Sequence, residues 1–167
     1  MSRRIRALAA PLLALVLAGC GWHLRGSGVE GLQGRAVTLT ASSGLDEVRD
    51  LVRRQLRGYG AELAATGSGA PVLELVTERT PRRALATDSR GRAVEYQLNY
   101  QLVYRVHAPA VQGSGQQGVA SAEGSYEVDG EAALAEQGRR ERLLESLRAE
   151  AVRRMLARLA VTLPESR

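Results

Sequence analysis

Cys20 is the residue whose chemistry is defined most clearly by its neighbours. It directly follows the run Leu17-Ala18-Gly19, and the short apolar stretch that precedes this run, from residue 7 onward, comes after three arginines. This is the pattern of a secretory signal that ends in a lipobox, so we expect a diacylglycerol on the Cys20 sulfur and cleavage just before it. The apolar stretch is shorter than the ~20 residues that a membrane-spanning helix needs, which makes a transmembrane anchor the less favoured interpretation.

The expected mature chain, residues 20–167, would therefore be tethered to a membrane surface. Each buried methylene group contributes about 0.8 kcal/mol, and two or three acyl chains make such attachment effectively permanent. Gly21 follows the cysteine. By resemblance to bacterial lipoproteins, an Asp at this position would favour retention in the inner membrane. We therefore expect the mature chain to be anchored in the outer membrane and to face the periplasm. Apart from the covalent lipid on Cys20 we expect no cofactor.

A second group of residues suited to chemistry is the basic segment from residue 79 to 92. It has a local charge of +4, from one acid, Asp88, and five arginines, which are Arg79, Arg82, Arg83, Arg90 and Arg92. Clustered guanidinium groups bind phosphate through charge-assisted and often bidentate hydrogen bonds. The segment therefore predicts a site for a phosphorylated lipid headgroup. The alternative is a solvated loop whose arginines pair with acids elsewhere.

The other reactive residues do not predict a catalytic or metal site. His23 and His107 are the only histidines and do not have metal-ligand spacing, and no Gly-x-Ser-x-Gly motif is present. Many carboxylates fall on a predicted helix beside arginines, as in the i,i+4 pair Glu150–Arg154, which is typical of a solvated helix face. We expect a protein that is not an enzyme and holds no metal. An envelope hydrolase is the alternative, and it would need a reactive group that this pattern lacks.

Composition narrows the class further. Removal of residues 1–19 takes away three arginines and no acids, so the net charge falls from +5 to +2, which does not favour a nucleic-acid partner. Cys20 is the only cysteine, so the mature chain has no internal disulfide and must be stabilised by packing.

Hydrophobic periodicity predicts the elements that position these groups. Period-two alternation indicates strands, and apolar residues at three- and four-residue steps indicate helices. The expected strands are 36–40, 72–80, 94–106 and 119–128, and the expected helices are 45–59 and 131–159, with a break or kink near Gly138. The fold class is α+β, with two helices packed on one face of a mostly antiparallel four-stranded sheet, in a single domain over residues 20–167.

The strand 94–106 has the clearest alternation in the chain. Tyr96, Tyr100 and Tyr104 share its apolar face, where they either form core under the helices or make an exposed ridge that docks a partner. The opposite face is polar from Glu95 to Gln101, and it meets either water or a polar partner.

Two segments carry a resemblance to a known family. Ala18-Gly19-Cys20-Gly21-Trp22-His23-Leu24-Arg25 and Arg90-Gly91-Arg92-Ala93-Val94-Glu95-Tyr96-Gln97 resemble the LptE (RlpB) family of lipopolysaccharide-assembly lipoproteins. The spacing and order of elements are similar from Cys20 to about Leu163. The resemblance implies a two-helix, four-stranded sandwich that sits as a plug inside the outer-membrane β-barrel LptD, helps that barrel assemble, and places lipopolysaccharide in the outer leaflet with it.

The resemblance also implies which residues make contacts. Basic groups at the start of the long strand, here Arg90 and Arg92, and at the start of the second helix would contact lipopolysaccharide. At the helix, Glu136 stands where the family leads us to expect a basic residue, and Arg139 and Arg140 follow it. Trp22 and the three tyrosines are candidates for contact with a partner. A lipid-anchored binding module for another envelope partner is the alternative function.

Overall fold

The structure is a computed structural model, and it describes residues 29–108, 115–128 and 133–163. The expected cleavage site, Cys20 and Trp22 lie outside the described residues. The elements in chain order are η1 (Glu30–Leu32), β1 (Ala36–Ala41), α2 (Asp46–Gly58), β2 (Glu62–Leu63), β3 (Val72–Arg79), β4 (Arg82–Thr87), β5 (Ala93–His107), β6 (Gln116–Glu127) and α3 (Ala133–Thr162).

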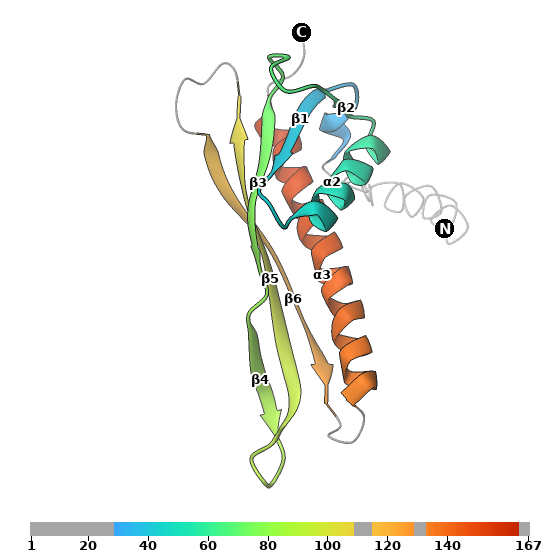
Figure 1. The fold of residues 1–167 in the computed structure, drawn as a ribbon, viewed down its shortest axis with the longest axis vertical. Helices are drawn as coiled ribbons and strands as arrows, with labels where there is room; N and C mark the ends of the chain where they lie inside the picture. Colours follow the sequence, from blue (N-terminus) through green and yellow to red (C-terminus); the bar gives the residue numbers. More distant parts are fainter. Residues whose placement is uncertain (1–28, 109–114, 129–132, 164–167) are drawn as a thin grey trace, which may run out of the picture.

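Strand β5 is the centre of the sheet, and both of its edges are paired (Figure 1). β6 pairs with one edge in an unbroken antiparallel register from Glu95–Glu127 to Val106–Gln116. The other edge is shared, because β3 pairs with the C-terminal half of β5 and β4 pairs with its N-terminal half. β3 and β4 therefore follow one another along β5 and are separated only at Thr80 and Pro81.

The expected fold class is confirmed, but the sheet is mixed and has six strands where four mostly antiparallel ones were expected. β1 runs parallel to both β3 and the two-residue strand β2. Neither β2 nor β4 was expected. β4 lies inside the basic segment that was expected to be a connection. The sequence Arg82–Thr87 does not alternate, and it is a strand because β3 leaves the N-terminal half of β5 without a partner.

Both helices cover one face of the sheet, as predicted (Figure 1). In α2, apolar residues at four-residue steps, Val48, Val52 and Leu56, are buried. The longer α3 buries Leu147, Ala151, Met155 and Leu159, and it continues through Gly138 without the expected break. Val48, Val52, Leu56 and the α3 residues belong to one hydrophobic core with the even-numbered residues of β5 from Leu98 to Val106.

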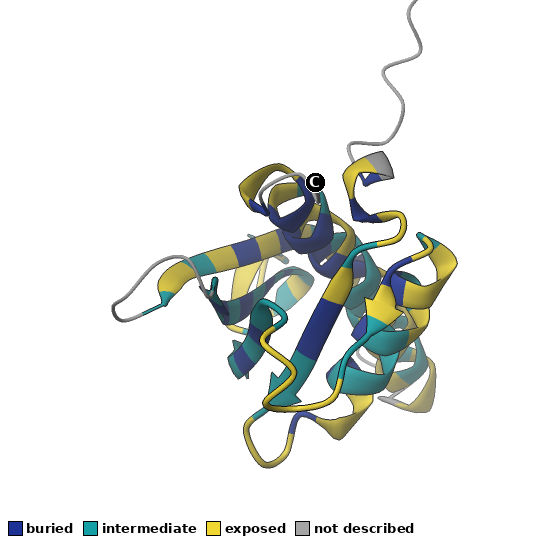
Figure 2. Ribbon diagram, turned by 90° about the horizontal axis from the view of Figure 1, so that it is seen from above, coloured by how far each residue is buried: buried dark blue, intermediate teal, exposed yellow. Residues whose placement is uncertain are grey.

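Burial alternates along β5 as its sequence predicts. Buried and exposed residues also alternate along β6, the strand beside the C-terminal end of α3 in the view from above (Figure 2). The even-numbered residues from Leu98 to Val106 are buried against the helices, while the odd-numbered ones are half-buried on the face that no described helix covers. We call this second face the open face. Tyr100 is fully buried and Tyr104 is 6% exposed, so both belong to the core and present almost no surface to a partner. Tyr96 is half-buried.

The free edge of β6 is covered by arginines of α3. The Val128 N–H donates to the Val94 carbonyl. The backbone N–H and C=O groups of the even-numbered residues of β6 therefore point toward β5, and those of the odd-numbered residues point away from it. Three outward carbonyls accept hydrogen bonds from guanidinium groups, namely Ser121 from Arg154 at 2.8 Å, Val119 from Arg158 at 2.8 Å and Glu127 from Arg139 at 3.1 Å.

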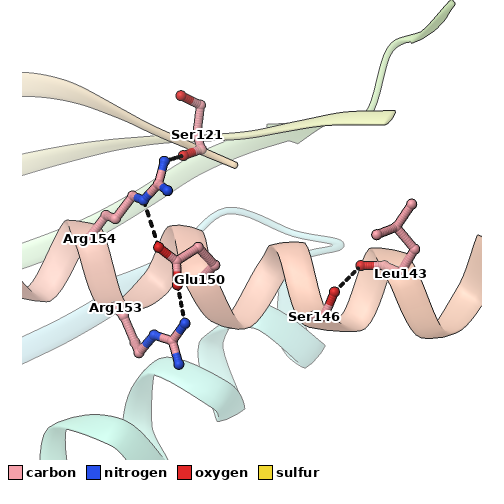
Figure 3. A network of polar contacts seen from close by, with 6 residues as sticks. All are labelled: Ser121, Leu143, Ser146, Glu150, Arg153 and Arg154. Atoms are coloured by element: carbon pink, nitrogen blue, oxygen red, sulfur yellow. Dashed lines mark hydrogen bonds and ion pairs between the residues drawn. The ribbon is translucent and has the colours of Figure 1, made fainter. Parts of the chain in front are cut away.

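The position of Arg154 is fixed from a second side. Its Nε donates to Glu150 at 2.8 Å, and the same carboxylate also binds Arg153, so Glu150 holds Arg154 while Arg154 reaches the Ser121 carbonyl (Figure 3). The arginines satisfy backbone groups that a further strand would otherwise use, which protects this edge of the sheet.

A polar network ties both helices to the sheet. Arg148 of α3, whose side chain is 11% exposed, pairs with Glu47 of α2 at 2.8 Å and with Glu78 of β3 at 3.3 Å. The Tyr100 hydroxyl of β5 donates to the other oxygen of Glu78 at 2.8 Å. Glu78 faces the helices because the register of β3 shifts between Leu75 and Thr77 and so reverses which residues point inward.

We expect alkaline pH to destabilise the fold through Tyr100. Burial, together with the Glu78 carboxylate, raises the pKa of the Tyr100 phenol above its ordinary value of about 10. The stabilisation that the neutral Tyr100 phenol gives to the folded state is therefore complete below about pH 10, and it is lost as the pH rises through the raised pKa. Tyr100→Phe should weaken this pH dependence and lower the free energy of unfolding at neutral pH by about 1 kcal/mol, measured by urea denaturation. Tyr59→Phe is the matched control, and an equal effect there would contradict the assignment.

Candidate functional site

The five arginines of the basic segment lie along β3, β4 and the β4–β5 turn. The turn lies at the end of the molecule where the hairpin extends past α3 (Figure 1), whereas Arg79 is opposite Gln101 near the middle of β5. The arginines do not form one cluster. Residues that lie opposite one another on paired strands point to the same face, so the register assigns each arginine to a side of the sheet. Arg82 is opposite Leu98 on the helix-facing side, whereas Arg83 and Arg79 are opposite Gln97 and Gln101 on the open face.

Arg82 is held by two aromatic rings. Its guanidinium carbon lies 4.2 Å from the centre of the Tyr96 ring, and Nη1 donates to the Tyr126 hydroxyl at 3.3 Å. Tyr96 and Tyr126 are cross-strand neighbours whose rings stack at 6.0 Å. The hydrogen bond to Tyr126 raises the pKa of Arg82, and Glu136 on α3 contributes to the same shift. Arg82 therefore braces the hairpin, and Glu136 lies close enough to act on its charge.

Arg83 belongs to a polar ladder on the open face. Its Nε donates to the Gln97 side-chain oxygen at 2.5 Å, and the Gln97 amide donates in turn to Glu123 on β6 at 3.4 Å. The direct partner of Arg83 is thus a neutral amide, which leaves its positive charge uncompensated by a bonded carboxylate.

Asp88 organises the β4–β5 turn. One carboxylate oxygen accepts the backbone N–H groups of Arg90 and Arg92 at 2.8 and 2.9 Å, and the other accepts Arg92 Nε at 2.9 Å. The backbone hydrogen bond from Arg92 is the largest cause of a lowered Asp88 pKa. Gly91 completes the turn at φ 75°, a conformation that favours glycine. Asp88 and Arg92 thus fix the turn that presents Arg90.

The charges available to an anion are therefore fewer than the sequence indicates. Within the described residues, Arg79 and Arg90 are exposed and their guanidinium groups make no hydrogen bond or ion pair. Arg83 is exposed and bonded to an amide, while Arg82 and Arg92 have structural partners. Arg79 and Arg83 lie about 13 Å apart along the open face, four residues at ~3.3 Å each, so one phosphate does not bridge them.

The basic residues at the start of α3 are also separated by their contacts. Arg139 binds the Glu127 carbonyl and borders a cavity of about 350 Å³ with Val94, Glu95 and Val128. Arg140 is exposed. Arg139 is therefore partly committed to the edge of β6, whereas Arg140 is open to solvent.

The described residues contain no group of three or more side chains suited to a metal ion. His107 contacts Glu74 at 3.2 Å and Arg105 lies 3.6 Å from the same carboxylate, which makes a polar cluster on the open face. Among the helices that the structure describes, none combines the length and apolarity needed to cross a membrane.

Sequence reasoning missed Tyr126 and Arg148. Tyr126 is identified only when the β5–β6 register places it opposite Tyr96, and its spacing within the hairpin is the signal that points to this pair. Arg148 resembles the other arginines of a solvated helix, and no sequence signal separates it from them. Cys20 and Trp22 stay predictions, because the structure does not describe them.

The geometry of the described residues defines a class of protein. A curled mixed sheet has two helices on one face, a polar second face that no described helix covers, and an arginine-rich hairpin that extends past α3. This is a small α+β domain whose prominent features are surfaces for contact.

The family is defined by comparison with known proteins. Residues 35–159 match the family model for LptE, lipopolysaccharide-assembly, and the chain belongs to this family. The LPS-assembly lipoprotein LptE of Photorhabdus laumondii is 32% identical over 110 residues, and that of Pectobacterium atrosepticum is 30% identical over 111 residues. Each alignment covers 65% of this chain and 60% of the relative's length.

Solved structures agree with this assignment. The rare lipoprotein B of Shewanella oneidensis has a TM-score of 0.69 at 28% identity, over 77% of this chain and 96% of that chain. A minor lipoprotein from Acinetobacter baumannii, at 16% identity, has a TM-score of 0.64 over 81% of this chain and 98% of its own, which shows a shared fold.

We expect substitutions of Arg82 and of Arg90 to differ in their effect on the free energy of unfolding. Arg82→Ala removes the contacts with Tyr96 and Tyr126 and should lower the free energy of unfolding by about 0.5–1 kcal/mol. Arg90→Ala removes no contact and should change it by less than about 0.5 kcal/mol. Chemical denaturation of both variants measures the difference, and equal losses would show that the aromatic brace does not stabilise the hairpin.

Proposed function

We propose that this chain is a lipid-anchored outer-membrane subunit of a lipopolysaccharide-assembly machine. It acts by contact and catalyses no reaction. It occupies the lumen of an LptD-type β-barrel, helps that barrel assemble, and contacts lipopolysaccharide through its basic hairpin. Membership of the LptE family and the names of its relatives support this function.

The position of Arg90 in the β4–β5 turn carries the proposal. The described chain begins at η1, where Gly31 packs against Ala160 near the C-terminal end of α3, and the β4–β5 turn lies at the opposite end (Figure 1). The 30 residues of α3 span about 45 Å. A bilayer with its headgroups is about 40–45 Å thick. A molecule tethered near η1 and standing upright therefore presents Arg90 at the distance of the headgroups in the opposite leaflet.

The open face supports a partner with a polar interior. It carries Gln97, Asn99, Gln101, Ser121 and Glu123 on β5 and β6, and no described helix covers it. The lumen of an outer-membrane barrel is polar, so this face can lie against the lumen wall without burying unpaired apolar surface.

The arginines that lack partners provide the sharpest test of lipopolysaccharide contact. Arg79→Glu together with Arg90→Glu should weaken lipopolysaccharide binding, by about two- to fivefold for each arginine, because an exposed charge contact contributes about 0.5–1 kcal/mol. The loss should shrink as salt is added, since salt screens exposed charges. Binding of the purified protein to lipopolysaccharide over a salt series measures both effects.

The matched control is Arg54→Glu with Arg57→Glu on α2. These arginines are also exposed, so the control makes the same change in net charge at a distance from the hairpin. If both double variants bind alike, the hairpin has no specific role in lipid contact. We reverse Arg79 and Arg90 and leave Arg92 in place, because its loss would also disturb the turn built by Asp88.

The partner is tested by purification of the tagged chain from detergent-solubilised outer membrane. We expect an LptD-type barrel to co-purify, and depletion of the chain should leave that barrel misassembled. Co-purification of a different envelope protein, with a normally assembled barrel after depletion, would favour the binding module for another partner.

A further inference from the structure

An apolar pocket lies between the last turns of α3 and the start of β6. Its volume is about 630 Å³, which is within the range of pockets that bind small molecules or large side chains. The buried side chains of Tyr104, Val106 and Leu159 form its inner wall. Polar groups border it at Arg158, Thr162 and the two glutamines that begin β6.

The described residues around the pocket leave this space unfilled. A Cβ atom at Gly118 would lie 2.4 Å from the Tyr104 ring, so the ring packs directly on the backbone of β6 and no side chain fits above it. On the helix, Val161 also lines the pocket, yet it is 83% exposed. Its side chain extends the apolar wall of the cavity outward, so that a further apolar group could bury both together.

The described chain begins beside this same end of α3. Val29 and Leu32 are buried, and a Cβ at Gly31 would lie 3.0 Å from the Ala160 carbonyl oxygen. Arg35 Nη1 donates to the Leu163 carbonyl at 2.6 Å, which fixes the start of the chain to the last turn of α3. The entry point of the N-terminal segment and the pocket thus lie on neighbouring sides of one helix end.

Trp22 is within reach of the pocket. Six residues lie between it and Val29, and the seven steps from one Cα to the next span at most about 25 Å. The helix that stands between the entry point and the pocket has a diameter of about 10–12 Å with its side chains.

The chemistry of the pocket fits an indole ring. A buried tryptophan needs apolar walls and an acceptor for its N–H, and the border of the pocket offers the Thr162 hydroxyl and the glutamine side-chain oxygens. Arg158 adds a cation that can lie over the ring, and its hydrogen bond to the Val119 carbonyl at 2.8 Å holds it in place. Trp22 is the only tryptophan in the chain.

We propose that Trp22 docks in the pocket formed by Tyr104, Val106, Gly118, Leu159 and Val161, and so fastens the segment after Cys20 to the C-terminal end of α3. The docked segment sets the end of the domain that lies nearest the acyl chains. The interaction is intramolecular, and it requires neither the barrel nor lipopolysaccharide.

Fluorescence of the single tryptophan tests this directly in the mature lipidated protein. Wild-type emission should lie at short wavelength and resist quenching by acrylamide. Val161→Asp places a charge in the pocket, so it should shift the emission to longer wavelength and increase quenching several-fold. Because Val161 is 83% exposed, this change leaves the core intact, which circular dichroism verifies. Leu134→Asp, at a side chain 86% exposed near the other end of α3, is the matched control and should leave the emission unchanged.

Other occupants give different results. If the wild-type emission is that of a solvated indole, Trp22 does not dock. If it is at short wavelength but Val161→Asp has no effect, Trp22 is buried in detergent or lipid. Either result overturns the proposal. A second measurement uses a naphthalene sulfonate dye that fluoresces in apolar cavities. Trp22→Ala should increase its binding, and Val161→Asp in the same chain should abolish the increase. An unchanged dye signal in Trp22→Ala would show that another group, such as an acyl chain, fills the pocket.

Discussion

The length of β5 is the constraint on which the rest of the structure depends. Fifteen extended residues expose backbone groups on both edges over about 50 Å, and these groups need partners throughout. β6 supplies one edge alone, whereas the other edge takes β3 and then β4. The alternation of β5 decides the layers, because its apolar side chains draw α2 and α3 to one face and leave the other face polar.

Strand register also decides which charges are available. Five arginines that are close in sequence are divided between two faces and a turn, and their partners differ accordingly. Arg82 stacks on tyrosine, Arg83 bonds an amide, and Arg92 completes the turn of Asp88. Of these five, only Arg79 and Arg90 have guanidinium groups without a partner among the described residues. A local charge of +4 thus overstates the charge that a ligand would meet.

Much of the fold could be predicted from the sequence, because both helices and the strands β1, β3, β5 and β6 have clear periodicity. β2 and β4 could not, since neither has a pattern of its own and each is a strand only because a neighbour has a free edge. The register shift in β3 could not be predicted from the sequence either. Strict alternation after Leu73 and Leu75 would place Thr77 inward, whereas the bulge turns Glu78 inward, where it meets Arg148. At the candidate site the arginines were identifiable by residue type, but their division between faces required the pairing.

The arginines that cover the edge of β6 have a consequence for crowding. Proteins confined to a membrane plane meet their neighbours at effective concentrations that can reach the millimolar range, where even weak lateral association is populated. An open strand edge would template such association. Arg139, Arg154 and Arg158 occupy the carbonyls on one side, and on the other side Pro81 and the like charges of β4 oppose self-pairing. These features oppose edge-to-edge pairing with a second copy at high surface density and leave the domain available to a different kind of molecule.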